Sequence, residues 1–120
     1  MDRRQIGQSA EDIAANFLQA QGVRLLLRNY RRRLGELDLV ACEGDILLII
    51  EVRTRASEQY GGAAASIDLQ KRRRIICAAQ QLLQERKDLA QLRARFDVVV
   101  VWNPGTHEPP VEWIKHAFEM

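Results

Sequence analysis

Two neighbouring segments decide the fold: Gly35-Glu36-Leu37-Asp38-Leu39-Val40 and, after a short turn, Ile49-Ile50-Glu51-Val52-Arg53. Each is rich in branched apolar residues, and the pair is separated by the turn-forming residues Glu43-Gly44-Asp45, a pattern typical of a β-hairpin. Side chains in a strand alternate between the two faces of a sheet. The position of the turn therefore determines which charged residues meet.

Two turn positions are compatible with this hairpin. A two-residue turn at Gly44-Asp45 places Asp38 directly opposite Glu51, whereas a turn at Glu43-Gly44 makes them diagonal neighbours. Either register puts both carboxylates on one face, about 4.5–8 Å apart. A three-residue loop would shift the pairing and weaken this prediction.

The apolar pattern of the hairpin argues against simple surface charges, which are the commoner role of carboxylates in strands. Val40, Leu47 and Ile49 continue the face of the two acids, and the opposite face is predicted to carry a second apolar set: Leu37, Leu39, Leu48, Ile50 and Val52. A hairpin that is apolar on both faces is normally covered on both. Two close carboxylates in such surroundings repel each other unless a proton or a cation lies between them. Divalent ions such as Mg²⁺ bind carboxylate oxygens, so Asp38 and Glu51 are candidate metal ligands.

The rest of the chain predicts helices around a strand-rich centre. Besides the hairpin (36–42 and 46–53), we expect helices over 9–21 and from Asp68 to about Lys87, a loop over 57–66, and strands over 23–29, 96–102 and 111–116. Asp68 is the expected N-cap of the second helix. This order predicts an α/β fold, a mixed central β-sheet flanked by α-helices, in a single domain over residues 1–120.

Composition narrows the class of protein. The chain has 120 residues, 47% of them hydrophobic and 28% charged, as in ordinary folded domains. Cys42 and Cys77 lack the spacing of a zinc or redox motif and suit buried free thiols. The beginning of the chain does not resemble a signal peptide, and the apolar runs are too short to span a bilayer. We therefore expect a cytoplasmic protein without membrane contact.

Basic residues are clustered although the formal net charge is only +2. The clusters are Arg31 to Arg33, Arg53 with Arg55, and Lys71 to Arg74. Such clusters either bind phosphates or form solvated faces, and the sequence pattern leaves both roles open.

Two charged residues in the predicted helices are candidates to lie beside the acidic pair. Glu11 borders the apolar stripe of the first helix, and Lys71 shares a stripe with Ile75 and Leu82 in the second. Either side chain can therefore face the sheet, although a solvated position is the ordinary alternative for both.

The ordered set of motifs resembles the bacterial YraN-like family of uncharacterised proteins, which is related in fold to restriction endonucleases and archaeal Holliday-junction resolvases. The residues that carry the resemblance span almost the whole chain: Glu11, Arg28-Asn29, Gly35 to Val40, Glu51 to Arg55, Gly61-Gly62, Lys71 and Arg95 to Val99. The resemblance implies the PD-(D/E)xK nuclease core and a restriction endonuclease-like fold.

The resemblance also implies roles for individual residues. Asp38 and Glu51 would hold Mg²⁺ or Mn²⁺ together with the carbonyl of Val52, and Glu11 would be the additional carboxylate from a helix. The position two residues after Glu51 is normally lysine in this scheme but is Arg53 here. Arginine stays protonated and cannot act as a general base, although it can stabilise charge on a phosphate. Lys71, which matches a lysine of the family in the following helix, would supply the missing amine.

The expected activity is metal-dependent hydrolysis of a phosphodiester in branched or otherwise structured DNA. Asp38, Glu51, Arg53 and Lys71 would form the catalytic set. The expected contacts to the nucleic-acid backbone come from basic residues near it: Arg31, Arg32, Arg33, Arg55, Arg72 and Arg73.

Two other functions are compatible with the same residues. One is a nucleic-acid-binding protein that keeps the nuclease scaffold without its chemistry, which Arg53 makes credible, and the other is a protein-interaction module. By analogy with resolvases the chain is also a candidate homodimer, and the Val98–Trp102 strand would offer a pairing edge if it lay at the border of the sheet.

Overall fold

The computed structural model describes residues 3–56 and 67–120. The expected loop over 57–66 lies outside the described residues. The elements follow the chain in this order: α1 (Arg3–Ala20), β1 (Arg24–Arg32), β2 (Gly35–Glu43), β3 (Ile46–Arg55), α2 (Leu69–Glu85), α3 (Lys87–Ala90), β4 (Arg93–Trp102) and β5 (Val111–Phe118).

The sequence pattern found both long helices and all five strands, with shifted ends. α1 begins at Arg3 rather than near Ser9, because the polar first turns lack the apolar periodicity on which the prediction rested. Arg31 and Arg32 belong to β1, which was expected to end at Asn29. The short helix α3 was not predicted.

One mixed sheet contains all five strands in the sequential order β1-β2-β3-β4-β5. β3 and β4 are parallel, and the other three neighbouring pairs are antiparallel. A parallel pair needs a crossover connection, and α2 provides it between β3 and β4. The predicted α/β architecture, a mixed sheet flanked by helices, is therefore confirmed.

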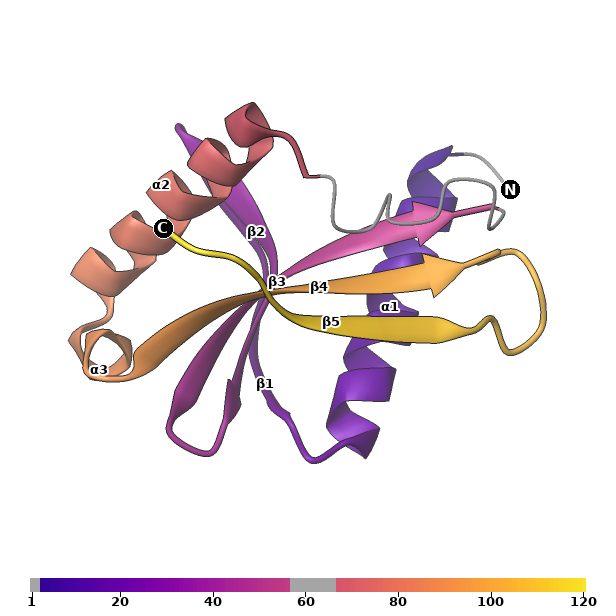
Figure 1. The fold of residues 1–120 in the computed structure, drawn as a ribbon, viewed down its shortest axis with the longest axis horizontal. Coiled ribbons are helices and arrows are strands. Elements are labelled where there is room, and N and C mark those ends of the chain that lie inside the picture. The colour runs from indigo at the N-terminus through magenta and orange to yellow at the C-terminus, as the bar shows by residue number, and fades with distance from the viewer. Residues whose placement is uncertain (1–2, 57–66) are drawn as a thin grey trace.

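The sheet is buried on both faces, as the two-sided apolar pattern predicted (Figure 1). On one face α2 covers a core that includes Val40, Ile49, Val98 and Val100. On the other face α1 covers the strand residues whose side chains point the opposite way: Leu39, Ala41, Leu48, Ile50, Val99 and Val101. The strands that carry the acidic pair thus lie between two apolar layers.

The strands β2 and β3 separate partway along their length. Their antiparallel pairing runs only from Glu43–Ile46 to Leu39–Ile50. Beyond that point β2 lies with β1 beneath α2, whereas β3 continues beside β4 (Figure 1). Leu37 packs in the α2-side core together with Val40, whereas Leu39 packs on the α1 side, which differs from the strict alternation predicted.

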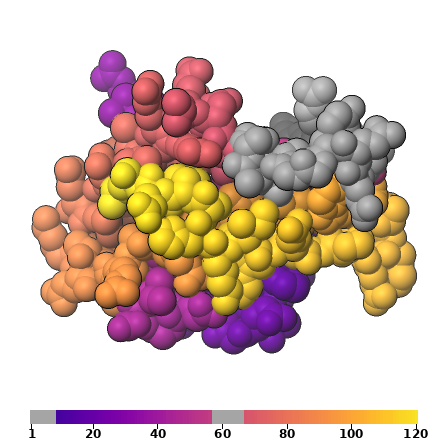
Figure 2. Space-filling view, viewed as in Figure 1, coloured from indigo at the N-terminus to yellow at the C-terminus, as the bar shows by residue number. Residues whose placement is uncertain are grey.

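A glycine at the start of β2 holds this strand against α2. A Cβ atom added to Gly35 would lie 2.0 Å from the carbonyl oxygen of Arg74. The backbones of β2 and α2 are therefore in direct contact, and only glycine fits there. The adjoining β1–β2 turn projects past α2 as the purple protrusion of the space-filling view (Figure 2).

The Val98–Trp102 segment is internal, since β4 lies between β3 and β5. It is thus no edge for pairing across a dimer. None of the helices in the described part of the chain is long and apolar enough to span a membrane.

Candidate active site

Asp38 lies at the point where β2 and β3 part. The turn is the two-residue Gly44-Asp45 alternative, because Glu43 pairs with Ile46. In this register Asp38 follows the last paired residue of β2, and its Oδ2 accepts a hydrogen bond of 2.9 Å from the backbone N–H of Val52. The carboxylate therefore fills the gap that opens between the strands.

Glu51 is the first residue of β3 beyond the pairing with β2, and only 6% of its surface is exposed. Burial, followed by the charge of Asp38 and a hydrogen bond with it, raises the pKa of Glu51 to about 8, while Lys71 and Arg53 oppose this shift. The two acids form the pair that strand parity predicted. Glu51 retains a proton at neutral pH unless a cation compensates its charge.

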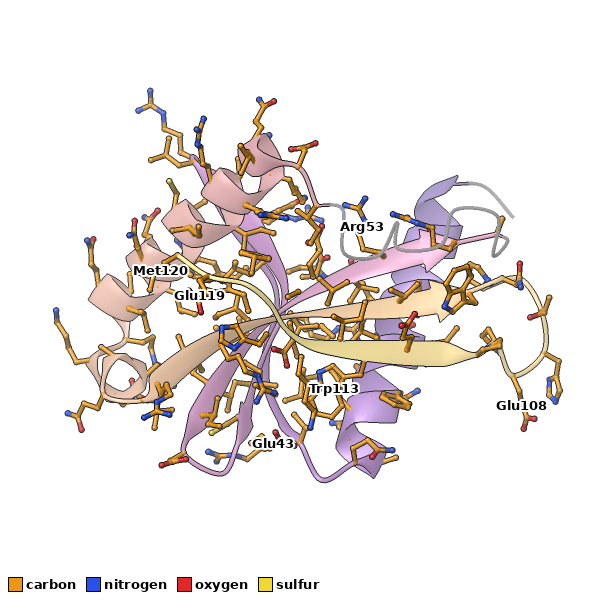
Figure 3. All side chains as sticks on the ribbon, in the orientation of Figure 1. Glu43, Arg53, Glu108, Trp113, Glu119 and Met120 are labelled. Atoms are coloured by element: carbon orange, nitrogen blue, oxygen red, sulfur yellow. The ribbon has the colours of Figure 1, made fainter. Side chains whose placement is uncertain are left out.

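Two basic side chains complete the cluster. The Nζ of Lys71 lies 3.5 Å from Oε2 of Glu51, and Nη1 of Arg53 lies 3.9 Å from the same oxygen. Lys71 stands in the first turn of α2, where its N–H binds the predicted N-cap Asp68 at 2.8 Å. Arg53 extends from the part of β3 that pairs with β4 but no longer with β2 (labelled in Figure 3). Both cations are partly exposed, so they are accessible from solvent.

Glu11 approaches the pair from α1. Its pKa is raised mainly by partial burial and then by the negative charge of Asp38, whereas Arg28, a hydrogen bond from Asn29 and Arg31 lower it. An ion pair of 2.6 Å between Arg28 and Asp12 ties α1 to β1 beside this residue. Glu11, which borders the apolar stripe of α1, therefore lies close enough to Asp38 for the two charges to interact.

A metal ion at this site would need ligands beyond the acidic pair. Across residues 3–56 and 67–120, no three His, Cys, Asp or Glu side chains gather as a complete ligand set. Mg²⁺ commonly binds one or two carboxylates and fills its other positions with carbonyls, water or substrate phosphate. Asp38 and Glu51 suit such an open site, and the carbonyl of Val52, whose N–H donates to Asp38, is a candidate further ligand.

The predicted phosphate contacts divide into two groups. Arg31, Arg33 and Arg73 are exposed, as a contact surface requires. Arg32 instead makes two hydrogen bonds to Glu85, at 3.0 and 2.8 Å. Its guanidinium is therefore already engaged.

The other two predicted contacts are partly buried. Arg72 lies over the ring of Phe118 at 5.7 Å. Arg55 is at the end of β3, and its Nη1 donates to the carbonyl of Thr54 at 2.7 Å. The contact of Arg72 is typical of side-chain packing and that of Arg55 of the end of a strand, so neither indicates phosphate binding in particular.

Residue-by-residue reasoning missed the role of Asn29. Its φ of 53° is left-handed, it lies in β1 between the residues that pair with Leu39 and Leu37, and its side chain forms a hydrogen bond with Glu11. An asparagine within an apolar strand pattern is the available sequence signal, since Asn tolerates this conformation better than most residues.

Comparisons with known proteins place the same residues in a family context. Residues 10–101 match the family described as "Uncharacterised protein family UPF0102". A UPF0102 protein of Methylococcus capsulatus is 47% identical over 113 residues, which cover 94% of this chain and 89% of the relative. One from Pseudomonas savastanoi pv. phaseolicola is 41% identical over 117 residues, covering 98% and 95%. One from Pseudomonas aeruginosa is 42% identical over 117 residues, covering 97% and 94%.

Proposed function

The chain belongs to the uncharacterised protein family UPF0102, the YraN-like family that its motifs resemble, and we propose that it is a metal-dependent phosphodiesterase acting on structured DNA. The observation that carries the proposal is the convergence of Asp38, Glu51 and Lys71 where β2 and β3 separate. Two acids and an amine at the open end of a strand pair suit hydrolysis of a phosphodiester.

The donor set fits a divalent cation. Asp38 and Glu51 supply hard oxygen ligands, and the buried Glu51 carries a proton that a cation would replace. When bound, Mg²⁺ or Mn²⁺ would polarise a phosphate oxygen and lower the pKa of a water molecule.

Lys71 and Arg53 would neutralise the substrate. Once a divalent cation has replaced the proton of Glu51, the charges of Lys71 and Arg53 balance the two carboxylates, so the cation makes the site positive. Both side chains end within 4 Å of Glu51 and are partly exposed, which places them to stabilise negative charge on a phosphate under attack. Only Lys71 can also transfer a proton, because arginine stays protonated.

The exposed arginines Arg31, Arg33 and Arg73 would bind the nucleic-acid backbone. Such contacts neutralise phosphates without reading bases. Selection by the shape of the DNA is therefore the expectation.

A cleavage assay tests the proposal. Branched, nicked and single-stranded DNA are incubated with the protein in Mg²⁺ or Mn²⁺, and products are resolved on a denaturing gel. Asp38→Asn, which keeps an acceptor for the Val52 N–H, should lower cleavage at least about 100-fold. Lys71→Met should lower kcat by roughly 100-fold or more through loss of charge and proton transfer.

The matched control is Asp45→Asn, since Asp45 is an exposed carboxylate at the opposite end of the same hairpin. Cleavage should be unchanged in this variant. If the wild type does not cleave, or Asp38→Asn cleaves as well as the wild type, the nuclease proposal is wrong. Salt-dependent DNA binding without cleavage would instead favour the non-catalytic scaffold.

A further inference from the structure

The tip of the β1–β2 hairpin exposes an apolar side chain. Arg32 pairs with Gly35 across the hairpin, so Arg33 and Leu34 form the turn. Leu34 is 62% exposed, and the turn projects beyond α2 (Figure 2). Leu34 adds nothing to the core, and its place on a projecting turn leaves it free to contact another molecule.

Cationic side chains surround this leucine. Arg31 on the hairpin is 73% exposed and lies 3.4 Å from the half-exposed Glu36, and Arg33 is next to Leu34 in the turn. Arg73 and Arg74 of α2 are exposed as well, and the backbone of Arg74 touches Gly35. A polyanion complements such a surface, whereas an apolar protein partner would bury several of these charges without compensation.

The hairpin is held rigidly on α2. Glu85 of α2 accepts hydrogen bonds from Tyr30, at 2.8 Å, and from Arg32, whose guanidinium lies 4.1 Å from the centre of the Tyr30 ring. On the other strand Gly35 rests against the backbone of Arg74. Both strands of the hairpin are therefore attached to α2, and these contacts support the tip in its projecting position.

We propose that Leu34 is a wedge that enters the base stack of DNA at a nick or branch point while the adjacent arginines bind phosphates. The inference rests on the proposed nucleic-acid function and adds a substrate class to it. Apolar side chains are known to separate base steps, and separation is easiest where the stack is already broken. A leucine forms no hydrogen bond with a base edge, so the wedge recognises a discontinuity and not a sequence.

The wedge also fixes where cleavage would occur. Leu34, in the turn directly before β2, precedes Asp38 by four residues, roughly 13 Å when counted as extended chain at about 3.3 Å per residue. This corresponds to about four base-pair steps of 3.4 Å. We expect cleavage within about four nucleotides of the discontinuity.

The test separates wedging from cleavage by omitting metal. In EDTA, 2-aminopurine at the branch point of a junction reports unstacking by fluorescence, and anisotropy reports binding. The wild type should increase the fluorescence severalfold at the branch point and little within an unbroken duplex. Leu34→Ala should abolish most of the increase and weaken junction binding about three- to tenfold relative to duplex binding, whereas Leu34→Phe should retain both.

The matched control is Met120→Ala, because Met120 is 67% exposed at the end of the chain and outside the hairpin (labelled in Figure 3). It should behave as the wild type. If Leu34→Ala keeps the full fluorescence increase and junction preference, the wedge is refuted while the nuclease proposal stands. Absence of any DNA binding by the wild type overturns both, and unstacking without later cleavage in Mg²⁺ supports the wedge alone.

Discussion

Glu51 is a buried acid whose ionisation opposes folding. Its pKa is about 8 in the folded chain, owing first to burial and then to Asp38, against an ordinary value of 4.5. Between these values the unfolded chain loses the proton while the folded chain keeps it. Stability is therefore lost as the pH rises from about 4.5 to 8, and the loss is complete above the folded pKa. Each unit of difference corresponds to about 1.4 kcal/mol.

Glu51→Gln should remove this pH dependence. In EDTA, we expect the variant to be more stable than the wild type at pH 8, on the order of a few kcal/mol, and the difference to shrink towards pH 5. Urea unfolding at pH 5, 6, 7 and 8 measures it. Glu112→Gln, which alters an exposed acid on β5, should follow the wild type. Parallel curves for Glu51→Gln and the wild type would show that Glu51 ionises normally.

At the scale of elements, Gly35 keeps β2 against α2 and thereby opens the sheet at the candidate site. Gly35→Ala would bring a Cβ to 2.0 Å from the Arg74 carbonyl, a contact that backbone cannot relieve without moving β2 or α2. We expect a loss of about 2–4 kcal/mol in the free energy of unfolding. Gly105→Ala is the matched control, because a Cβ there meets no atom within 4 Å. Equal urea midpoints for both variants would contradict the close contact.

Asp97 links β5 to β4 through side-chain hydrogen bonds. It is 0% exposed and accepts hydrogen bonds from both guanidinium donors of Arg95 (2.8 Å each), from Trp113 Nε1 (2.9 Å) and from the His116 N–H (2.9 Å). These bonds span the irregular pairing of β4 and β5, and Trp113 continues toward α1 to meet Phe17 (Figure 3). Asp97 is therefore a structural residue, although the family motif contains it.

Asp97→Asn should cost about 3–5 kcal/mol, since it replaces the buried carboxylate by an amide that cannot accept all of these bonds and leaves the mostly buried Arg95 with Glu43, at 3.7 Å, as its remaining acidic partner. The control is Asp88→Asn, which breaks a similar pair with Arg86 at the surface and should cost at most about 1 kcal/mol. Chemical unfolding gives both values, and hydrogen exchange should show lost protection in β5 for Asp97→Asn alone. A small effect on both measurements would show that Asp97 does not hold β5 to the sheet.

These elements show which features a sequence can predict. That Asp38 and Glu51 lie on the same face was predictable, because a hairpin with a short turn allows only a few pairing registers, all set by local sequence. The separation of β2 and β3 was not, since it depends on the contact of Gly35 with a helix 39 positions later in the chain. The Asp97 network was missed for the same reason. Its donors come from another strand, and a single acid in an apolar strand does not reveal them.

At the scale of the molecule, the order of the strands in the sheet and the identity of its edge strands could not be predicted from local sequence patterns either. A mixed sheet followed from the alternation of strands and helices, but nothing in β4 revealed that β5 would pair with it and cover its free edge. In the whole fold, one sheet carries α2 on one face and α1 on the other, and its strands β2 and β3 part at the acidic pair. A ligand bound there would connect these two strands.

Binding of Mn²⁺ should accordingly stabilise the entire fold. Asp38 lies on the β2 side of the opening and Glu51 on the β3 side, so a cation held by both joins the two strands beyond their last paired residues and replaces a buried proton. A ligand at 100 times its Kd adds about 2.7 kcal/mol. For a chain of this size we expect the melting temperature at pH 8 to rise on the order of 10 °C. Asp38→Asn and Glu51→Gln should lose most of this rise, whereas Asp45→Asn should keep it. A rise of equal size in all four proteins would place the bound Mn²⁺ away from the acidic pair.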